Sequence, residues 1–292
     1  MAAGPFDRAQ AWFDARLRRE LRAAARDVYL VPRRVAARRG ERMRPTFLIL
    51  GAQKAGTTSL FRYLAQHPRV VEPIVKEVHF FDASFHKGLD WYLAHFPRDP
   101  ADGRTITGEG SPYYLYHPHC ADRIAETFPE ARLLVLLRNP IDRAVSHHGH
   151  ERRQGGERRP MQQAFDEERA RVPGAEATLA AHPRRDSRAH RRESYLSRGI
   201  YAPQLERYLA RFPREQLLVQ RYDRFFAEPG PHFARVLEHL GLGPVEVPFE
   251  RHGGGDRRPS DQGFDRAALA AFFRPHNERL SELLGEDFTD WQ

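Results

Sequence analysis

The chain has 292 residues, of which 40% are hydrophobic and 29% charged, an ordinary balance for one globular domain with at most a small appendage. The formal net charge of +8 favours anionic ligands such as nucleotides, nucleic acid or acidic lipid. A single cysteine, Cys120, excludes an internal disulfide, and no apolar run approaches the roughly 20 residues that a membrane span needs.

Residues 1–44 come first, and their pattern predicts a basic amphipathic helix in which Trp12 and Leu30 are among the few apolar members. Two interpretations stay open for this helix. It either packs on the domain as a solvated helix, or it contacts an anionic membrane or another partner. The first 20 residues lack the apolar stretch of a secretion signal, so we expect a cytoplasmic protein, soluble or membrane-associated.

Residues 45–292 are predicted to form the main domain, in which short apolar runs alternate with helical patterns. This alternation predicts an α/β fold, with a parallel sheet of about five strands flanked by helices. Strands are expected at residues 46–50, 132–137 and 216–220. Helices are expected at residues 57–66, from Pro140 onward, at 231–240 and at 265–285.

Residues 151–194 differ from the rest of the domain, because they are rich in Arg, Glu and Ala and have little periodicity. The segment is predicted to be a variable insertion that is mobile, acts as a substrate lid, or forms loosely packed helix.

The loop at residues 51–59 (GAQKAGTTS) lies between a predicted strand and a predicted helix. Such a loop presents backbone N–H groups and a helix dipole to an anion, and its hydroxyls can donate to phosphate oxygens. In the loop of nucleoside triphosphatases a lysine would occupy the position of Thr57, whereas here Lys54 lies inside the loop. Only three of the 47 basic residues are lysines, which suggests that the ammonium of Lys54 has a specific role.

A second motif, residues 76–82 (KEVHFFD), places Glu77 and His79 beside two phenylalanines. Burial there would raise the pKa of Glu77 toward neutrality and suit it as a general base, provided that Lys76 points away. His79 is the competing base, because its ordinary pKa already lies near 6.5.

A third motif, residues 138–146 (RNPIDRAVS), places Arg138 at the end of a predicted strand and Ser146 two helical turns later. Because open α/β sheets bind ligands at the carboxyl ends of their strands, these two side chains could hold a second phosphate. The alternative is a structural pair between Arg138 and Asp142.

Together these motifs resemble the sulfotransferases that use PAPS (3′-phosphoadenylyl sulfate) as donor, and more closely the branch that sulfates heparan sulfate. The resemblance runs from about Thr46 to the carboxyl end, outside residues 151–194, and includes residues 88–92 (GLDWY) and 198–201 (RGIY). It implies a P-loop-containing sulfotransferase fold and an enzyme that moves a sulfuryl group from PAPS to a hydroxyl or amine, which could belong to a carbohydrate or glycolipid.

The resemblance also implies roles for individual residues. Glu77 would be the catalytic base, Lys54 would contact the sulfuryl group and its bridging oxygen, and His79 would support them. The donor, or its product PAP, would be bound without a metal by Lys54, Ala55, Gly56, Thr57, Thr58, Ser59, Arg138 and Ser146, and by Arg257 and Arg258 in a late basic loop. The acceptor would contact Lys76, Asp82, Ser111, Tyr113 and Arg198.

Two departures bear on the acceptor. The heparan branch carries a lysine directly after the acidic residue that matches Glu109, where this chain has Gly110, and it carries a disulfide that this chain cannot form. Both departures argue against a heparan-like acceptor but not against PAPS as donor. A polysaccharide, a glycolipid, an antibiotic scaffold and a peptide stay open as acceptors, and the sequence specifies no oligomeric state.

Two other functions compete with sulfuryl transfer. An ATP-dependent small-molecule kinase is disfavoured by Thr57 and by the lack of a metal-binding acidic strand end. The many arginines would also suit a non-catalytic module that binds anionic glycans or membranes. Such a module would not explain why Lys54 lies inside a phosphate-binding loop and Glu77 beside His79 and two phenylalanines. The histidines at 147, 148 and 150, and those near Cys120, are expected on polar helix surface and not at a metal; nucleic acid is not expected as a partner.

Overall fold

The computed structural model describes residues 24–183, 185–250 and 263–291, and its centre is a parallel sheet of four strands in the order β2-β1-β3-β4. The strands are β1 (Phe47–Gly51), β2 (Gly108–Glu109), β3 (Arg132–Leu137) and β4 (Leu217–Arg221). The three strands expected from the sequence are confirmed to within one residue at each end. The described residues contain four strands where about five were expected, and the strand that the sequence did not indicate, β2, is too short to show as an apolar run.

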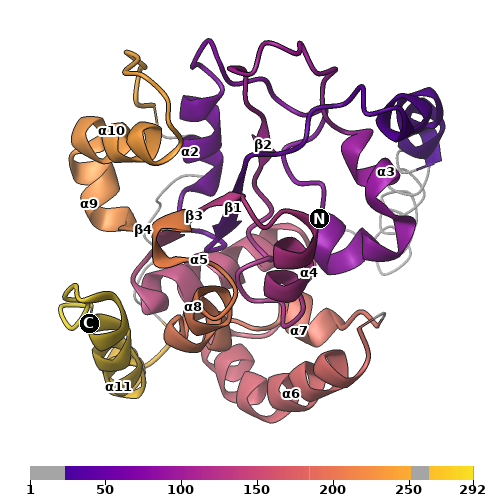
Figure 1. The fold of residues 1–292 in the computed structure, drawn as a ribbon. Helices are drawn as coiled ribbons and strands as arrows, with labels where there is room; N and C mark the ends of the chain where they lie inside the picture. The colour runs from indigo at the N-terminus through magenta and orange to yellow at the C-terminus, as the bar shows by residue number, and fades with distance from the viewer. Residues whose placement is uncertain (1–23, 184, 251–262, 292) are drawn as a thin grey trace, which may run out of the picture.

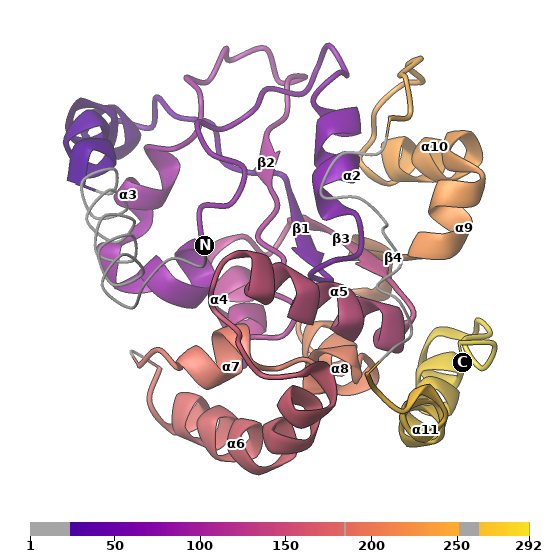
Figure 2. The same cartoon turned by 180° about the vertical axis from the view of Figure 1, so that it is seen from behind.

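The strands are buried on both faces, as a parallel sheet covered by helices requires. All five residues of β1 and five of the six residues of β3 are buried. β1 pairs with β3 through Leu48 and Leu133, and β3 pairs with β4 from Leu133 opposite Leu217 onward. Helices surround this sheet, with α9 and α10 on one side and α3 and the N-terminal helix on the opposite side (Figure 1 and Figure 2).

The helices predicted from the sequence are confirmed, and the described residues hold several others. The side chain of Asn139 caps α5 by accepting a hydrogen bond from the N–H of Ile141 at 2.9 Å, and Pro140 occupies the first turn. The α-helices are α2 (Thr57–Leu64), α3 (Leu89–Leu93), α4 (Cys120–Thr127), α5 (Pro140–Arg153), α6 (Met161–Ala181), α7 (Arg188–Arg192), α8 (Ala202–Leu209), α9 (Tyr222–Ala227), α10 (Pro229–His239) and α11 (Arg266–Leu284). Shorter turns are η1 (Phe80–Ser84), η2 (Phe85–Lys87), η3 (Ser197–Gly199) and η4 (Arg214–Gln216).

The described residues of the segment at 151–194 are largely helical. It contains the end of α5, all of α6 and all of α7. The packing is not loose, because Phe165, Val172 and Leu179 of α6 are buried. Phe165 also belongs to a second hydrophobic cluster, apart from the cluster around the sheet.

Residues 24–38 form a helix that contacts α3, where the indole N–H of Trp91 donates to Asp27 at 3.1 Å and Arg38 binds Asp90 at 2.8 Å. Leu30 is fully buried, and the guanidinium of Arg33 donates to the carbonyl oxygens of Ala94 at 2.6 Å and Phe96 at 2.8 Å. Trp12 lies outside the described residues. No helix among the residues that the structure describes is long and apolar enough to cross a membrane.

Candidate active site

A pocket of about 660 Å³ opens at the carboxyl edge of the sheet. Part of its wall is formed by the segments that directly follow the four strands, because the carboxyl ends of parallel strands all meet at one edge. Lys54 follows β1, Tyr113 follows β2, Arg138 follows β3 and Tyr222 follows β4. The fold therefore brings the three sequence motifs, far apart along the chain, to one cavity.

The loop from Gly51 to Ser59 forms one wall of the pocket. Gly56 has φ +81°, and a Cβ atom at this position would lie 2.5 Å from the ring of Phe226. Lys54 also has a positive φ, 70°, which is strained for a residue with a side chain and is found most often at functional sites. Thr57 and Thr58 open α2 toward the pocket. The N–H groups of this first turn have no partner within the helix, so they can bind an anion.

Among the expected donor contacts, Lys54, Gly56, Thr57, Thr58, Ser59, Arg138 and Ser146 line this pocket. Ala55 does not, because it is fully buried and its N–H donates to the carbonyl of Ala52 at 3.1 Å. The expected contact of Ala55 with the donor stays a prediction that the pocket lining does not support. Arg257 and Arg258 lie outside the described residues.

Positive charge gathers around Lys54. Desolvation lowers the pKa of Lys54, and the charges of Arg153, Arg138 and Arg143 lower it further, while Glu77 opposes them. Arg138 donates to the carbonyl of Lys54 at 3.1 Å, and its guanidinium lies 4.7 Å from the centre of the Tyr222 ring. A cavity in which cations outnumber anions binds a polyanion favourably.

Arg138 does not form the structural pair that the sequence left open. Asp142 instead binds Arg266 of α11 at 2.9 Å. The carbonyl of Arg138 accepts a hydrogen bond from the hydroxyl of Tyr201 at 2.7 Å, so the backbone is fixed while the guanidinium faces the pocket.

Glu77 and His79 lie together in the pocket as part of a chain of ionic contacts. The ammonium of Lys76 lies 2.9 Å from Oε1 of Glu77, and Nε2 of His79 lies 3.5 Å from Oε2. On its other side, Nδ1 of His79 lies 2.8 Å from the buried carboxylate of Asp82. Arg191 of α7 approaches the same Asp82 carboxylate at 3.5 Å.

These contacts reverse the expected pKa of Glu77. Desolvation favours the neutral acid, but the hydrogen bond from His79 and the charge of Lys76 outweigh it and lower the pKa of Glu77 to about 2. The expectations of a raised pKa and of Lys76 pointing away are wrong. Desolvation also opposes the charged form of His79, yet Asp82 and Glu77 raise its pKa to about 10. His79 is thus an imidazolium at neutral pH and has no lone pair with which to accept a proton.

A buried carboxylate supports this segment from behind. Glu109, which has no exposed surface, accepts hydrogen bonds from the N–H of Val78 at 3.0 Å and from the hydroxyls of Ser111 at 2.7 Å, Tyr92 at 3.0 Å and Tyr114 at 2.7 Å. The Ser111 hydroxyl accepts in turn from the N–H of His79 at 3.2 Å. The short strand β2 therefore sets the position of the 76–82 motif.

The expected acceptor contacts divide into two groups. Tyr113 and Arg198 line the pocket, whereas Lys76, Asp82 and Ser111 do not. Asp82 and Ser111 are buried and bind His79 and Glu109, so they position the site. Their expected contact with an acceptor stays a prediction. Lys76 is occupied by Glu77 and by the carbonyl of Gly110, at 3.2 Å.

The comparisons with known proteins agree with this geometry. Residues 44–251 match the model of the sulfotransferase domain. This chain belongs to the sulfotransferase family. A sulfotransferase from Alicyclobacillus acidocaldarius has a similar structure, with a TM-score of 0.68 and 32% sequence identity over 85% of this chain and 98% of that one.

Two human sulfotransferases are similar in sequence. Heparan sulfate glucosamine 3-O-sulfotransferase 3B1 is 30% identical over 273 residues, which cover 85% of this chain and 65% of that protein. Bifunctional heparan sulfate N-deacetylase/N-sulfotransferase 3 is 28% identical over 279 residues, or 85% of this chain. The chain spans only 31% of the length of that second relative.

Sequence reasoning missed several residues of this sulfotransferase pocket. Ser146 and His150 of α5 and Gln154, the residue that ends this helix, are spaced four apart and share a face. This spacing could have identified the last two. Arg191 and Arg192 come from α7, which is far along the chain from the three motifs, and no sequence pattern indicated that it lies at the pocket. The other missed lining residues are Gln53, Pro112, Glu151, Tyr222 and Phe226.

Most of the histidines that were expected on polar helix surface are buried inside the sulfotransferase fold. His147 and His148 are buried on α5, as are His117 and Cys120 near α4, so that expectation is wrong for these residues. His150 faces the pocket, where desolvation and the charge of Lys54 lower its pKa. Within residues 24–183, 185–250 and 263–291, no three His, Cys, Asp or Glu side chains could together hold a metal ion.

Proposed function

We propose that this chain transfers a sulfuryl group from PAPS to a hydroxyl or amine of a carbohydrate acceptor. The observation that carries the proposal is one pocket that contains the 51–59 loop, the Arg138 and Ser146 pair, and Glu77. Relatives of known activity act on heparan sulfate glucosamine, which supports a carbohydrate as the acceptor.

The residues present fit a donor with phosphates at two positions. The loop and the first turn of α2 would hold the 5′-phosphosulfate, and Arg138 with Ser146 would hold the 3′-phosphate. Tyr222 and Phe226 add aromatic surface beside these groups. PAPS supplies the sulfuryl group when bound, and the product that remains is PAP.

Glu77 is proposed as the catalytic base, on grounds that differ from a raised pKa. A carboxylate with a pKa of about 2 is ionised at every working pH, so it is always ready to accept a proton. It is a weak base toward a free hydroxyl, but the proton of that hydroxyl becomes strongly acidic once its oxygen bonds to sulfur. Lys54 stabilises the negative charge that develops on the leaving phosphate oxygen, and His79 holds Glu77 in position through their 3.5 Å contact.

Calorimetry with PAP and with ATP, each with and without magnesium, tests the donor assignment. ATP has no 3′-phosphate, and a hydrogen bond to a charged group contributes roughly 1.5–3 kcal/mol, so ATP should bind about tenfold or more weakly than PAP. A kinase would show the opposite preference and would need magnesium. A labelled-donor assay against carbohydrate acceptors then separates an enzyme from a non-catalytic binding module.

We also propose that the helix at residues 24–38 contacts an anionic membrane surface. Val28, Val31 and Val35 share one face of this helix through their spacing of three and four residues, and all are exposed, Val28 to 72%. Arginines flank this apolar stripe, as in helices that lie in the plane of a membrane interface. Full-length protein should sediment with phosphatidylserine vesicles at low salt, and a Val28→Ser, Val31→Ser variant should not. Equal sedimentation of both proteins would leave the helix with a packing role alone.

A further inference from the structure

The pocket contains more positive charge than the proposed donor site uses. Besides Lys54 and Arg138, it is lined by Arg191, Arg192 and Arg198 from α7 and the turn that follows. Of these three guanidinium groups, only that of Arg198 contacts the 51–59 loop, through the side chain of Gln53. Their partners within the described residues show which of them could serve a ligand.

Two of the three arginines are committed to the protein. Arg198 is buried; it donates to the side chains of Gln53 at 2.6 Å and Ser194 at 2.7 Å, and its guanidinium lies 4.6 Å from the centre of the Tyr113 ring. Arg191 binds Asp186 at 3.0 Å and approaches Asp82 at 3.5 Å.

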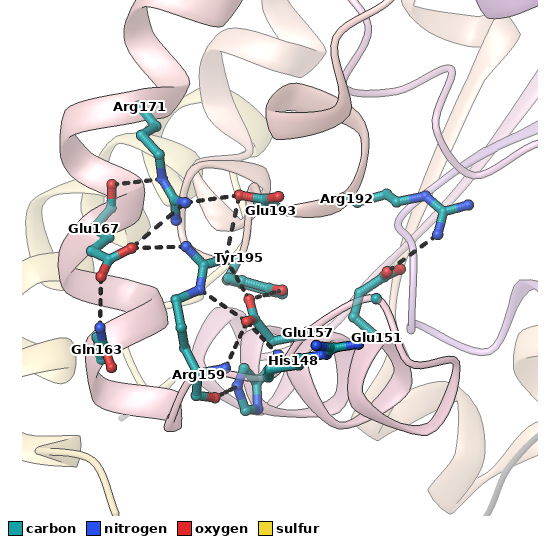
Figure 3. Close-up of polar contacts among 12 residues, drawn as sticks. His148, Glu151, Glu157, Arg159, Gln163, Glu167, Arg171, Arg192, Glu193 and Tyr195 are labelled. Atoms are coloured by element: carbon teal, nitrogen blue, oxygen red, sulfur yellow. Dashed lines mark hydrogen bonds and ion pairs between the residues drawn. The ribbon is translucent and has the colours of Figure 1, made fainter. Parts of the chain in front are cut away.

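Arg192 is held differently. Its one ion pair within the described residues joins a guanidinium nitrogen to Oε2 of Glu151 over 3.8 Å, which is too long for a hydrogen bond (Figure 3). Its side chain remains 32% exposed and faces the pocket. The guanidinium of Arg192 can therefore turn toward a ligand without losing a hydrogen bond.

Glu151 is an incomplete partner. The residue is buried, and its Oε2 has no hydrogen-bond donor among the residues that the structure describes. Gly156 packs against it so closely that a Cβ there would lie 2.6 Å from Oε2. Oε1 lies 4.0 Å from Nε2 of His147, again beyond hydrogen-bond reach. Burial raises the pKa of Glu151, in keeping with a carboxylate that has few partners.

The backbone around Arg192 is, in contrast, firmly anchored. Its neighbour Glu193 binds Arg171 at 3.0 Å and Arg159 at 3.3 Å, both from the α6 region. Arg159 also binds Glu157 at 2.6 Å. Figure 3 shows this network on one side and the separate contact between Arg192 and Glu151 on the other. A fixed main chain with a loosely held charged side chain is suited to binding a ligand.

We propose that Arg192 binds an acidic group of the acceptor, and that Glu151 holds its guanidinium only until the acceptor arrives. This inference rests on the proposed function. The planar fork of arginine can bind a carboxylate or a sulfate through two hydrogen bonds at once. The acceptor is accordingly a carbohydrate that carries an acidic group near the hydroxyl or amine that reacts.

Three variants test the role of Arg192, each with bound PAP. Arg192→Gln removes the cation, Glu151→Gln removes its competing partner, and Arg188→Gln is the control. Arg188 lies on the same helix and pairs with Glu193 at 3.2 Å, but its side chain is 65% exposed and does not line the pocket. The probes are an oligosaccharide containing uronic acid, the same oligosaccharide with its carboxyl groups reduced to alcohols, and a sulfated form of the reduced oligosaccharide.

Binding of each probe is measured by calorimetry, and PAP affinity confirms that each variant is folded. Arg192→Gln should weaken binding of a charged probe about tenfold or more and leave the reduced, unsulfated probe unaffected. Glu151→Gln should tighten binding of the charged probe, and Arg188→Gln should change it less than twofold. Preference for the uronic acid or for the sulfated probe identifies the acidic group.

Three results would overturn the inference: equal binding of charged and reduced probes by the unaltered protein, an equal loss in Arg192→Gln and Arg188→Gln, or no binding of any probe. None of these results bears on the use of PAPS as donor, which is tested separately by PAP binding and by transfer from labelled donor.

Discussion

The substitution Glu109→Gln tests whether the buried carboxylate behind the site has the importance that its contacts suggest. Each carboxylate oxygen accepts two hydrogen bonds, and an amide of the same shape can retain only one of these oxygens. Two of the four hydrogen-bond donors would then face the NH₂ group of the glutamine, which cannot accept a hydrogen bond from them. Hydrogen bonds to charged groups contribute roughly 1.5–3 kcal/mol each, and rotation of the hydroxyls would relieve part of the loss, so we expect a cost of about 3 kcal/mol.

Such a loss is a large fraction of the roughly 5–15 kcal/mol by which a folded protein is stable. Urea unfolding at pH 7 measures it, and Glu130→Gln, at an exposed position, is the matched control with an expected change within about 0.5 kcal/mol. Turnover should fall as well, because Glu109 positions Val78 and, through Ser111, the backbone of His79. A change in stability below about 1 kcal/mol would refute the reasoning, since the four hydrogen bonds would then contribute almost nothing.

Other predictions concern the pocket itself. Lys54→Ala should abolish turnover, and Lys54→Arg should not restore it, because the role is that of a compact charge; near-normal activity of Lys54→Arg in the labelled-donor assay would show that any cation suffices. Glu77→Gln should retain PAP binding and lose about two to four orders of magnitude in kcat, the usual contribution of a general base, and His79→Ala should lose less. Because the pKa of Glu77 is lowered to about 2 and that of His79 is raised to about 10, Glu77 stays ionised and His79 charged between those values. The profile of kcat/KM against pH should therefore show no limb from either group between about pH 4 and 9, whereas a limb from the carboxylate near pH 6–7 would contradict its assigned pKa. Gly56→Ala should abolish PAP binding in calorimetry, since the new Cβ would lie 2.5 Å from Phe226.

Comparing the loss of kcat in Glu77→Gln with that in His79→Ala identifies which residue is the base. If His79→Ala loses more kcat than Glu77→Gln while both still bind PAP, the base would be His79, and its imidazole would have to be neutral in the working enzyme. That result would also require the pKa of His79 to fall when the donor binds.

Local sequence determined much of the fold. The apolar runs at residues 46–50, 132–137 and 216–220 became β1, β3 and β4, because a strand buried on both faces must be continuously hydrophobic. The loop at residues 51–59 after the first run and Asn139-Pro140 after the second identified the donor side of the pocket. Both could be recognised because each consists of residues that are adjacent in the chain. Strand β2 escaped notice, since Gly108 and Glu109 show no apolar pattern at all.

Only the tertiary structure decided the electrostatics and the acceptor side. Sequence placed Lys76 beside Glu77 but could not show which way its ammonium points, and that direction decides the sign of the pKa shift of Glu77. Likewise, Arg192 and Glu151 are 41 residues apart and meet because α7 folds back over the end of α5. Propensity and periodicity depend on neighbours in the chain, whereas burial, charge and distance depend on neighbours in space.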